Sequence, residues 1–134
     1  MSLIMESKID HFNDVAEPLF KILIDKYNYI LDEIKIFHFK GSKWSTKLIY
    51  LNPEFNLKIE VEQAPFYTDY GFSFFIYNLS KDEYNILYNV PHEKQDGEDA
   101  FLHKAYEDLF SSQEMLDLIS GKHWHKLNRI AFQI

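Results

Sequence analysis

The hydrophobic period changes twice along the chain, and this change is the strongest constraint on the fold. Apolar residues recur at steps of three or four from Ser7 to Asp32, as on one face of a helix. Strand-like segments fill the middle of the chain, and the helical spacing returns after residue 99. Consecutive strands with helices at the two ends predict an α+β domain, in which an antiparallel sheet is packed by N-terminal and C-terminal helices.

The N-terminal helical segment contains an interruption. Ser7 is available as its N-cap. Pro18 lies inside the apolar pattern, where proline removes a backbone hydrogen bond and clashes with the preceding turn. We therefore expect a kink, or two helices of which the second begins near Pro18.

Four or five strands are expected in the middle of the chain. The clearest is the third, in which Leu57, Ile59 and Val61 alternate with charged residues. The fourth is apolar on both faces, which favours a central position in the sheet. The fifth has a pattern that a short helix could also explain. The expected strands are residues 34–40, 44–51, 57–62, 72–79 and 84–90.

Two helices are predicted after the strands. Asp99 can cap the first, which carries an apolar stripe from Phe101 to Leu109. The sequence 111–114 offers a capping box for the second, and Gly121 is placed to end it. No linker or internal repeat divides the chain, so we expect a single domain over residues 1–134.

The negative charge is concentrated in one part of the chain. Residues 61–110 contain ten acidic residues and three lysines, and so account for the whole net charge of −7. About half of the aromatic residues lie in the same stretch. Carboxylates steer a basic partner and aromatic rings supply contact area, so the pattern predicts binding of a basic protein. It argues against binding along a nucleic-acid backbone, which requires cations.

The candidate partner-binding residues lie in two segments that are predicted to be loops. Residues 63–71 form the first loop, and the polar residues 91–99 form the second. The two loops make one binding surface only if the fold brings them to the same end of the sheet. The candidate residues are Tyr67, Asp69, Tyr70, Glu93, Asp96, Glu98 and Asp99.

His123-Trp124-His125 is an alternative site. Histidines at alternate positions of a strand point the same way and can share a metal ion. A zinc site normally has three or four protein ligands, and the sequence shows no third ligand at a diagnostic spacing. We favour a buried Trp124 between two solvated histidines. The alternative function is a metal-dependent hydrolase or a metal-binding protein that uses His123 and His125.

Other chemistry has little support in the sequence. Cysteine is absent, which excludes thiolate metal sites and cysteine nucleophiles. The glycines are too far apart for a phosphate-binding loop, and no serine lies in a nucleophile-elbow pattern. We therefore expect no cofactor and favour a non-enzymatic protein. The N-terminus lacks the pattern of a secretory signal, and no apolar run approaches the ~20 residues that span a bilayer. A cytoplasmic location without membrane insertion is expected.

Residues 48–59, Leu48-Ile49-Tyr50-Leu51-Asn52-Pro53-Glu54-Phe55-Asn56-Leu57-Lys58-Ile59, resemble a pattern in small bacterial immunity proteins of polymorphic toxin systems. The shared pattern is a strand, Asn-Pro, an aromatic residue and an alternating strand, and the helix expected near residues 101–110 is similar in placement. Glu54 and Phe55 stand where the pattern has glycine and tryptophan. The resemblance implies an inhibitor that covers the active site of a basic toxin. A chaperone-like or dimerising adaptor, which could be a homodimer, is a further alternative.

Overall fold

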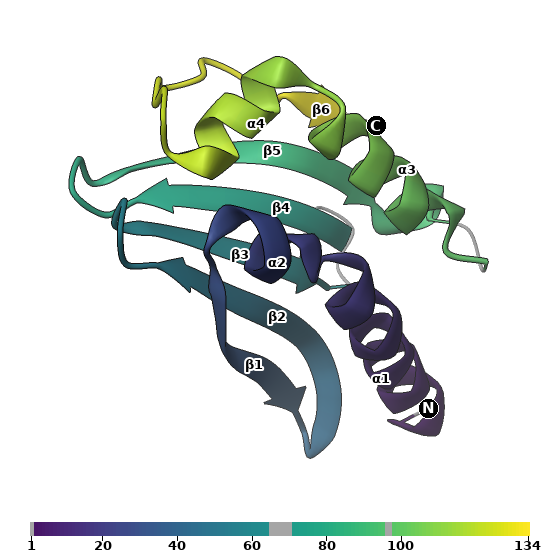
Figure 1. Cartoon of the computed structure of the whole chain (residues 1–134). Coiled ribbons are helices and arrows are strands. Elements are labelled where there is room, and N and C mark those ends of the chain that lie inside the picture. Colours follow the sequence, from purple (N-terminus) through teal and green to yellow (C-terminus); the bar gives the residue numbers. More distant parts are fainter. Residues whose placement is uncertain (1, 65–70, 96–97) are drawn as a thin grey trace.

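The protein is a layer of helices on one face of a six-stranded sheet (Figure 1). The computed structural model describes residues 2–64, 71–95 and 98–134, with the backbone alone for residues 2–6. The strands are β1 (Ile30–Phe39), β2 (Ser42–Asn52), β3 (Leu57–Gln63), β4 (Gly71–Asn78), β5 (Glu83–Pro91) and β6 (Phe132–Gln133). The helices are α1 (Ser2–Leu19), α2 (Ile22–Tyr27), α3 (Ala100–Phe110) and α4 (Gln113–Ser120), with a short 3-10 helix η1 (His92–Lys94).

The strands lie in the sheet in the order in which they occur in the sequence. Pairing is antiparallel from β1 to β5, and β6 pairs with β5 in the parallel direction. The α+β class is thus confirmed, but the sheet is mixed and has one strand more than the five expected. Two residues of the tail make β6, and flanking hydrogen bonds from Ala131 N to Ile86 O and from Ile134 N to Asn89 O hold the tail on β5.

The N-terminal part differs from the prediction at both ends. Two helices separate just after Pro18, as expected, although α2 begins only at Ile22. Ser7 lies inside α1, so its assignment as an N-cap is wrong. The predicted helix also ran too far, because Asn28 takes a left-handed conformation after α2 and Ile30 already pairs with Leu51. Pairing with β2 overrides the helical spacing of this short segment.

The core lies between the helices and the covered face of the sheet. Phe20, in the turn between α1 and α2, contacts the rings of Phe72 and Phe74 from β4. Phe12 of α1 also contacts Phe72. All four side chains are at most 2% exposed. The apolar pattern of the fourth strand assigned Phe72, Phe74, Phe75 and Ile76 to the core. Phe72, Phe74 and Ile76 are buried there, but the assignment of Phe75 is wrong, because its ring is half-buried on the opposite face of the sheet, beside Glu60. Among the described helices, none has the length and apolar character needed to cross a membrane.

Local capping signals fix the ends of α4. The Ser112 hydroxyl accepts a hydrogen bond from Met115 N at 3.4 Å. Gly121 ends the helix at a φ of 79°, and a Cβ there would lie 2.7 Å from the Phe55 ring, so glycine suits the position on two grounds. The capping box is wrong in one respect, because the Ser111 hydroxyl donates to Glu107 O and Ser112 is the N-cap.

Candidate functional site at the acidic end of the sheet

The described flanks of the first predicted binding segment lie at the same end of the sheet as the described part of the second. Gln63 ends β3, and its side-chain amide exchanges two hydrogen bonds with that of Gln95, at 2.7 and 2.9 Å. Gly71 begins β4 and pairs with Pro91 at the end of β5. The strand ends that flank residues 65–70 therefore lie beside the segment that follows β5. We call residues 92–95, 98 and 99, with Gln63 and Gly71, the acidic end.

Gly71 has a steric role at this junction. Its φ is 119°, and a Cβ on it would lie 2.3 Å from Val90 O and 2.7 Å from His92 N. No side chain fits in this space, so only glycine allows the start of β4 to approach the beginning of η1 so closely. Gln95 adds a bond from its Nε2 to Val90 O at 3.3 Å. The acidic segment is thus held against the sheet at both ends of η1.

Asp99 is held by a residue distant in the sequence. His11 Nε2 of α1 lies 2.6 Å from Asp99 Oδ2, and the Asp99 side chain is 18% exposed. Asp99 is at the N-cap position of α3 with a φ of 65°, but its side chain does not cap the helix. The predicted capping role is therefore wrong. Its backbone carbonyl instead accepts bonds from Leu102 N and His103 N, while the carboxylate joins α3 to α1.

The candidate residues have different surroundings. Glu93 and Glu98 are exposed, and Glu93 Oε2 lies 3.4 Å from His92 Nδ1. Lys94 is exposed in the same turn and offsets one of these charges. Tyr67, Asp69, Tyr70 and Asp96 lie outside the described residues. The described part of the acidic end thus presents the exposed carboxylates of Glu93 and Glu98, the first of which lies beside His92, and the less exposed carboxylate of Asp99, which is paired with His11.

The open face of the sheet, opposite the helices, carries a charged cluster that the sequence analysis missed. Glu60 on β3 is only 7% exposed. Its Oε1 accepts a hydrogen bond from Tyr77 Oη at 3.2 Å and from Lys47 Nζ at 3.3 Å, and Lys58 Nζ lies 3.4 Å from its Oε2. The alternation of Lys58 and Glu60 with apolar residues indicated their face, but the contacts with β2 and β4 depend on strand register. We call Lys47, Lys58, Glu60, Glu62 and Tyr77 the open-face cluster.

Burial changes proton affinities in this cluster. Desolvation raises the pKa of Glu62, and Lys47, whose Nζ is 3.8 Å from Glu62 Oε2, opposes that rise. Desolvation also raises the pKa of the Tyr77 phenol, and the neighbouring Glu60 carboxylate adds to the rise. Tyr77 is therefore a hydrogen-bond donor at neutral pH rather than a base. The two lysines balance the two glutamates, so the cluster has no net charge.

Aromatic rings surround the open-face cluster. Phe75, Tyr77 and Tyr84 contact one another with centroid separations between 5.6 and 6.5 Å. Lys58 Nζ lies 4.6 Å from the centre of the Tyr77 ring. These rings and the lysine stems cover the Glu60 carboxylate and keep it dry on a face without helices. The Glu60 carboxylate therefore has its hydrogen-bond and ion-pair partners within the fold.

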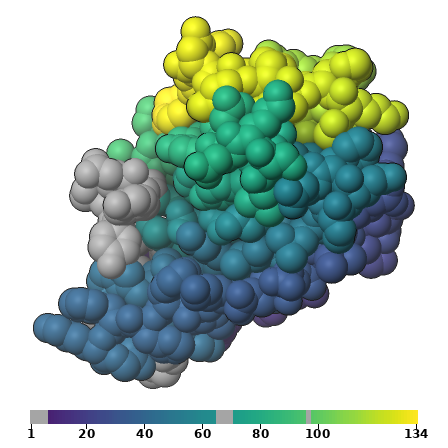
Figure 2. Space-filling model, turned by 90° about the vertical axis from the view of Figure 1, so that its left-hand side faces the viewer, coloured from purple at the N-terminus to yellow at the C-terminus, as the bar shows by residue number. Residues whose placement is uncertain are grey.

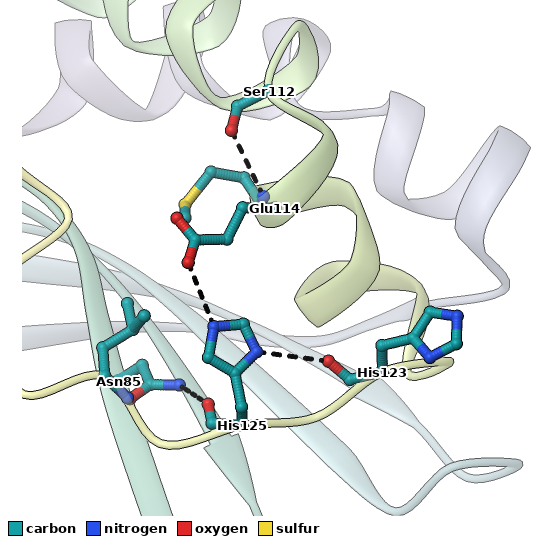
Figure 3. Close-up of polar contacts among 7 residues, drawn as sticks. Asn85, Ser112, Glu114, His123 and His125 are labelled. Carbon is teal, nitrogen blue, oxygen red and sulfur yellow. Dashed lines mark hydrogen bonds and ion pairs between the residues drawn. The ribbon is translucent and has the colours of Figure 1, made fainter.

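The histidine motif is attached to β5 and to α4 (Figure 3). Asn85 donates from Nδ2 to His125 O at 2.9 Å, and its Oδ1 accepts from Leu127 N at 2.8 Å. His125 Nε2 lies 3.1 Å from Glu114 Oε2, while the His123 ring points away from the His125 ring. Within the described residues, no three metal-binding side chains of the His, Cys, Asp or Glu type come together.

Trp124 completes this attachment. Its indole N–H donates to Glu83 Oε1 at 2.8 Å, and the ring is half-buried against the core, while both histidines are exposed. The two histidines are thus exposed, as expected, whereas Trp124 is half-buried rather than buried. Comparisons of the chain with protein-family models, with curated proteins and with solved structures gave no match.

Proposed function

We propose that this chain is a non-enzymatic protein-binding domain that takes a basic protein partner at the acidic end of the sheet. The observation that carries the proposal is the pairing of Gln63 with Gln95, which brings the flanks of both candidate segments together. A surface built from two segments can present carboxylates in a fixed arrangement, which favours specific recognition over general attraction to cations.

Charge distribution favours the acidic end over the open face. On the open face, Lys47 and Lys58 neutralise Glu60 and Glu62. Residues 92–99 contain four acidic residues and one lysine, so this segment keeps a net negative charge. Such a surface accelerates association with a basic protein and makes the rate fall with added salt.

The kind of partner follows from the resemblance of residues 48–59 to immunity proteins. A toxin that acts on nucleic acid needs a basic active-site surface, and an acidic inhibitor can cover it. In this proposal Glu93 and Glu98 contact the toxin directly. Asp99 has a positioning role, because its carboxylate is already bound to His11. Tyr67, Asp69, Tyr70 and Asp96 are proposed as further contacts.

The experiment measures binding to the product of the neighbouring open reading frame, or to a partner captured from the native cell. Glu93→Lys/Glu98→Lys is compared with the matched control Glu54→Lys/Glu107→Lys, which reverses two exposed carboxylates elsewhere. We expect the first variant to weaken binding at least about tenfold, with a lower association rate and a smaller salt dependence. The control variant should bind like the original protein.

Two results would contradict the proposal. If both variants weaken binding equally, only the overall charge matters and the acidic end is not a specific site. If neither changes the affinity of a verified complex, the partner binds elsewhere. Circular dichroism of both variants shows whether the fold is intact, so a loss of binding is not confused with unfolding.

A further inference from the structure

The two edges of the sheet differ in whether another segment covers them. At one edge, the tail lies along β5 and covers it with β6; in Figure 2 the yellow tail lies above the teal segments of β4 and β5. At the other edge, β1 runs for ten residues and, among the described strands, pairs only with β2. The blue segments of β1 and β2 lie furthest from the tail in the same view. Pairing of β1 with β2 is regular from Glu33 to Phe37, between two register shifts, and the unpaired edge of this part is a template for pairing with another strand.

Opposite charges lie two residues apart on this edge. Glu33 pairs across β2 with Ile49, and Lys35 pairs with Lys47, so both residues lie on the open face. Both are exposed, and within the described ranges neither takes part in an ion pair. Lys35 also lies opposite a like charge, which is unfavourable in an antiparallel pair. Lys35 Nζ lies 5.2 Å from the centre of the Phe37 ring, and Lys47 is paired with Glu60 and Glu62. A facing strand with a carboxylate beside Lys35 and a cation beside Glu33 would add two pairs of opposite charges at this edge.

We propose that β1 is a homodimer interface, where the β1 strands of two copies pair in the antiparallel direction about a two-fold axis at Ile34. In this register Ile34 lies opposite Ile34, and Glu33 of each copy lies opposite Lys35 of the other. The interface is isologous, as expected for a symmetric dimer. A second copy of the chain supplies the matching charges, because Glu33 and Lys35 of one antiparallel strand face Lys35 and Glu33 of the other.

Neighbouring symmetric registers are disfavoured by the same charges. Facing residues of an antiparallel pair point to the same side of a sheet, so the register can change only in steps that keep the faces matched. An axis at Glu33 would place Glu33 against Glu33, and an axis at Lys35 would place Lys35 against Lys35. Like charges directly opposite each other destabilise a pair. The axis at Ile34 gives two favourable pairs.

Packing on the other face supports the same register. Ile34 and Ile36 point to the helix side of the sheet, where they are only half-buried because they lie at its edge. A symmetric contact between the two Ile34 side chains removes more apolar surface from water. The dimer has one continuous sheet with the helices of both copies on the same side. The interface uses neither Glu93 nor Glu98, so it is independent of the proposed partner site.

The test measures the molar mass by sedimentation equilibrium over a range of concentrations. The original chain should show a reversible dimer of the 16.1 kDa protomer. Glu33→Lys alone and Lys35→Glu alone should each raise the dissociation constant at least about tenfold, because each places two like-charged pairs in the interface. The exchange Glu33→Lys/Lys35→Glu should restore the dimer. An equal mixture of the two single variants should form a heterodimer, since all facing charges are then opposite.

The matched control variants are Glu54→Lys and Lys122→Glu, which make the same charge changes at exposed positions outside β1. They should leave the dissociation constant unchanged. A chain that stays monomeric at millimolar concentration overturns the proposal. A dimer that is insensitive to both single reversals, or that the exchange variant fails to restore, also overturns it, because the subunits then meet at another surface. Circular dichroism verifies that each variant is folded.

Discussion

The two faces of the sheet use the same strands in opposite ways. On β3, Ile59 is completely buried beneath the helices, whereas its neighbour Glu60 is nearly as buried on the face without helices. The covered face excludes water with apolar side chains from distant helices. The open face does so with rings and lysine stems from neighbouring strands, which give the buried Glu60 carboxylate three partners. A charged group can thus be shielded from water on a face without helices, if the register of the strands places its hydrogen-bond and ion-pair partners beside it.

Adjacent phenylalanines on β4 test this difference most strongly. Phe74→Ala should lower the free energy of unfolding by about 3–5 kcal/mol, because its side chain is fully buried and the helices cannot close the cavity. Phe75→Ala is the matched control on the open face and should have a smaller effect, since that ring is half-buried. Urea unfolding of both variants measures the two values. Equal losses would mean that the open face is packed as tightly as the core.

Removal of the Glu60 carboxylate tests the open-face cluster. Glu60→Ala should lower stability by about 1–3 kcal/mol, because it leaves the Tyr77 hydroxyl without its acceptor and removes the ion pairs with Lys47 and Lys58, of which only Lys47 keeps a second partner, Glu62. Glu54→Ala, at an exposed turn, should stay within about 0.5 kcal/mol of the original protein. Chemical denaturation at pH 7 provides the comparison. A Glu60 variant as stable as the control would show that the cluster adds nothing to stability.

Removal of the Tyr50 hydroxyl and of the Tyr77 hydroxyl should affect the free energy of unfolding differently. Tyr50 is buried on the covered face, and its hydroxyl has no hydrogen-bond partner among the described residues. Tyr50→Phe should therefore leave stability unchanged or raise it by about 1 kcal/mol, whereas Tyr77→Phe should lower it by about 1 kcal/mol. Thermal and urea unfolding of both variants decide the sign. A loss of stability in Tyr50→Phe would reveal a partner of that hydroxyl.

The smallest expected effect is the pH dependence contributed by Glu62. Burial raises its folded pKa above the ordinary value of 4.5, so the folded protein holds this proton more tightly than the unfolded chain does. Its contribution to stability is therefore greatest below that value and declines as the pH rises through the folded pKa. Glu62→Gln should remove this decline. Free energies of unfolding at several pH values between 4 and 7 should converge for the two proteins toward low pH, with the variant favoured at neutral pH.

Sequence patterns located most of the elements and part of the candidate site. The alternation around Ile59 identified β3, and the position of Gly121 identified the end of α4. The acidic segment was visible as a local excess of carboxylates, but its place beside β3 was not. That placement depends on Gln63 and Gln95, which are 32 residues apart. The partner of Asp99 was hidden for the same reason, because His11 is 88 residues away.

The sequence by itself determined the succession of helices and strands up to α4, the face that each residue of β3 occupies, and the end of α4 at Gly121. Each of these depends on neighbours within a few residues, so a local pattern is sufficient. Tertiary structure alone decided that Ile30 belongs to a strand, that the tail adds β6, and that Glu60 meets Lys47 and Tyr77. These features arise from hydrogen-bond pairing and register between distant segments, whose free energy exceeds the weak preference of a short segment for helix or loop.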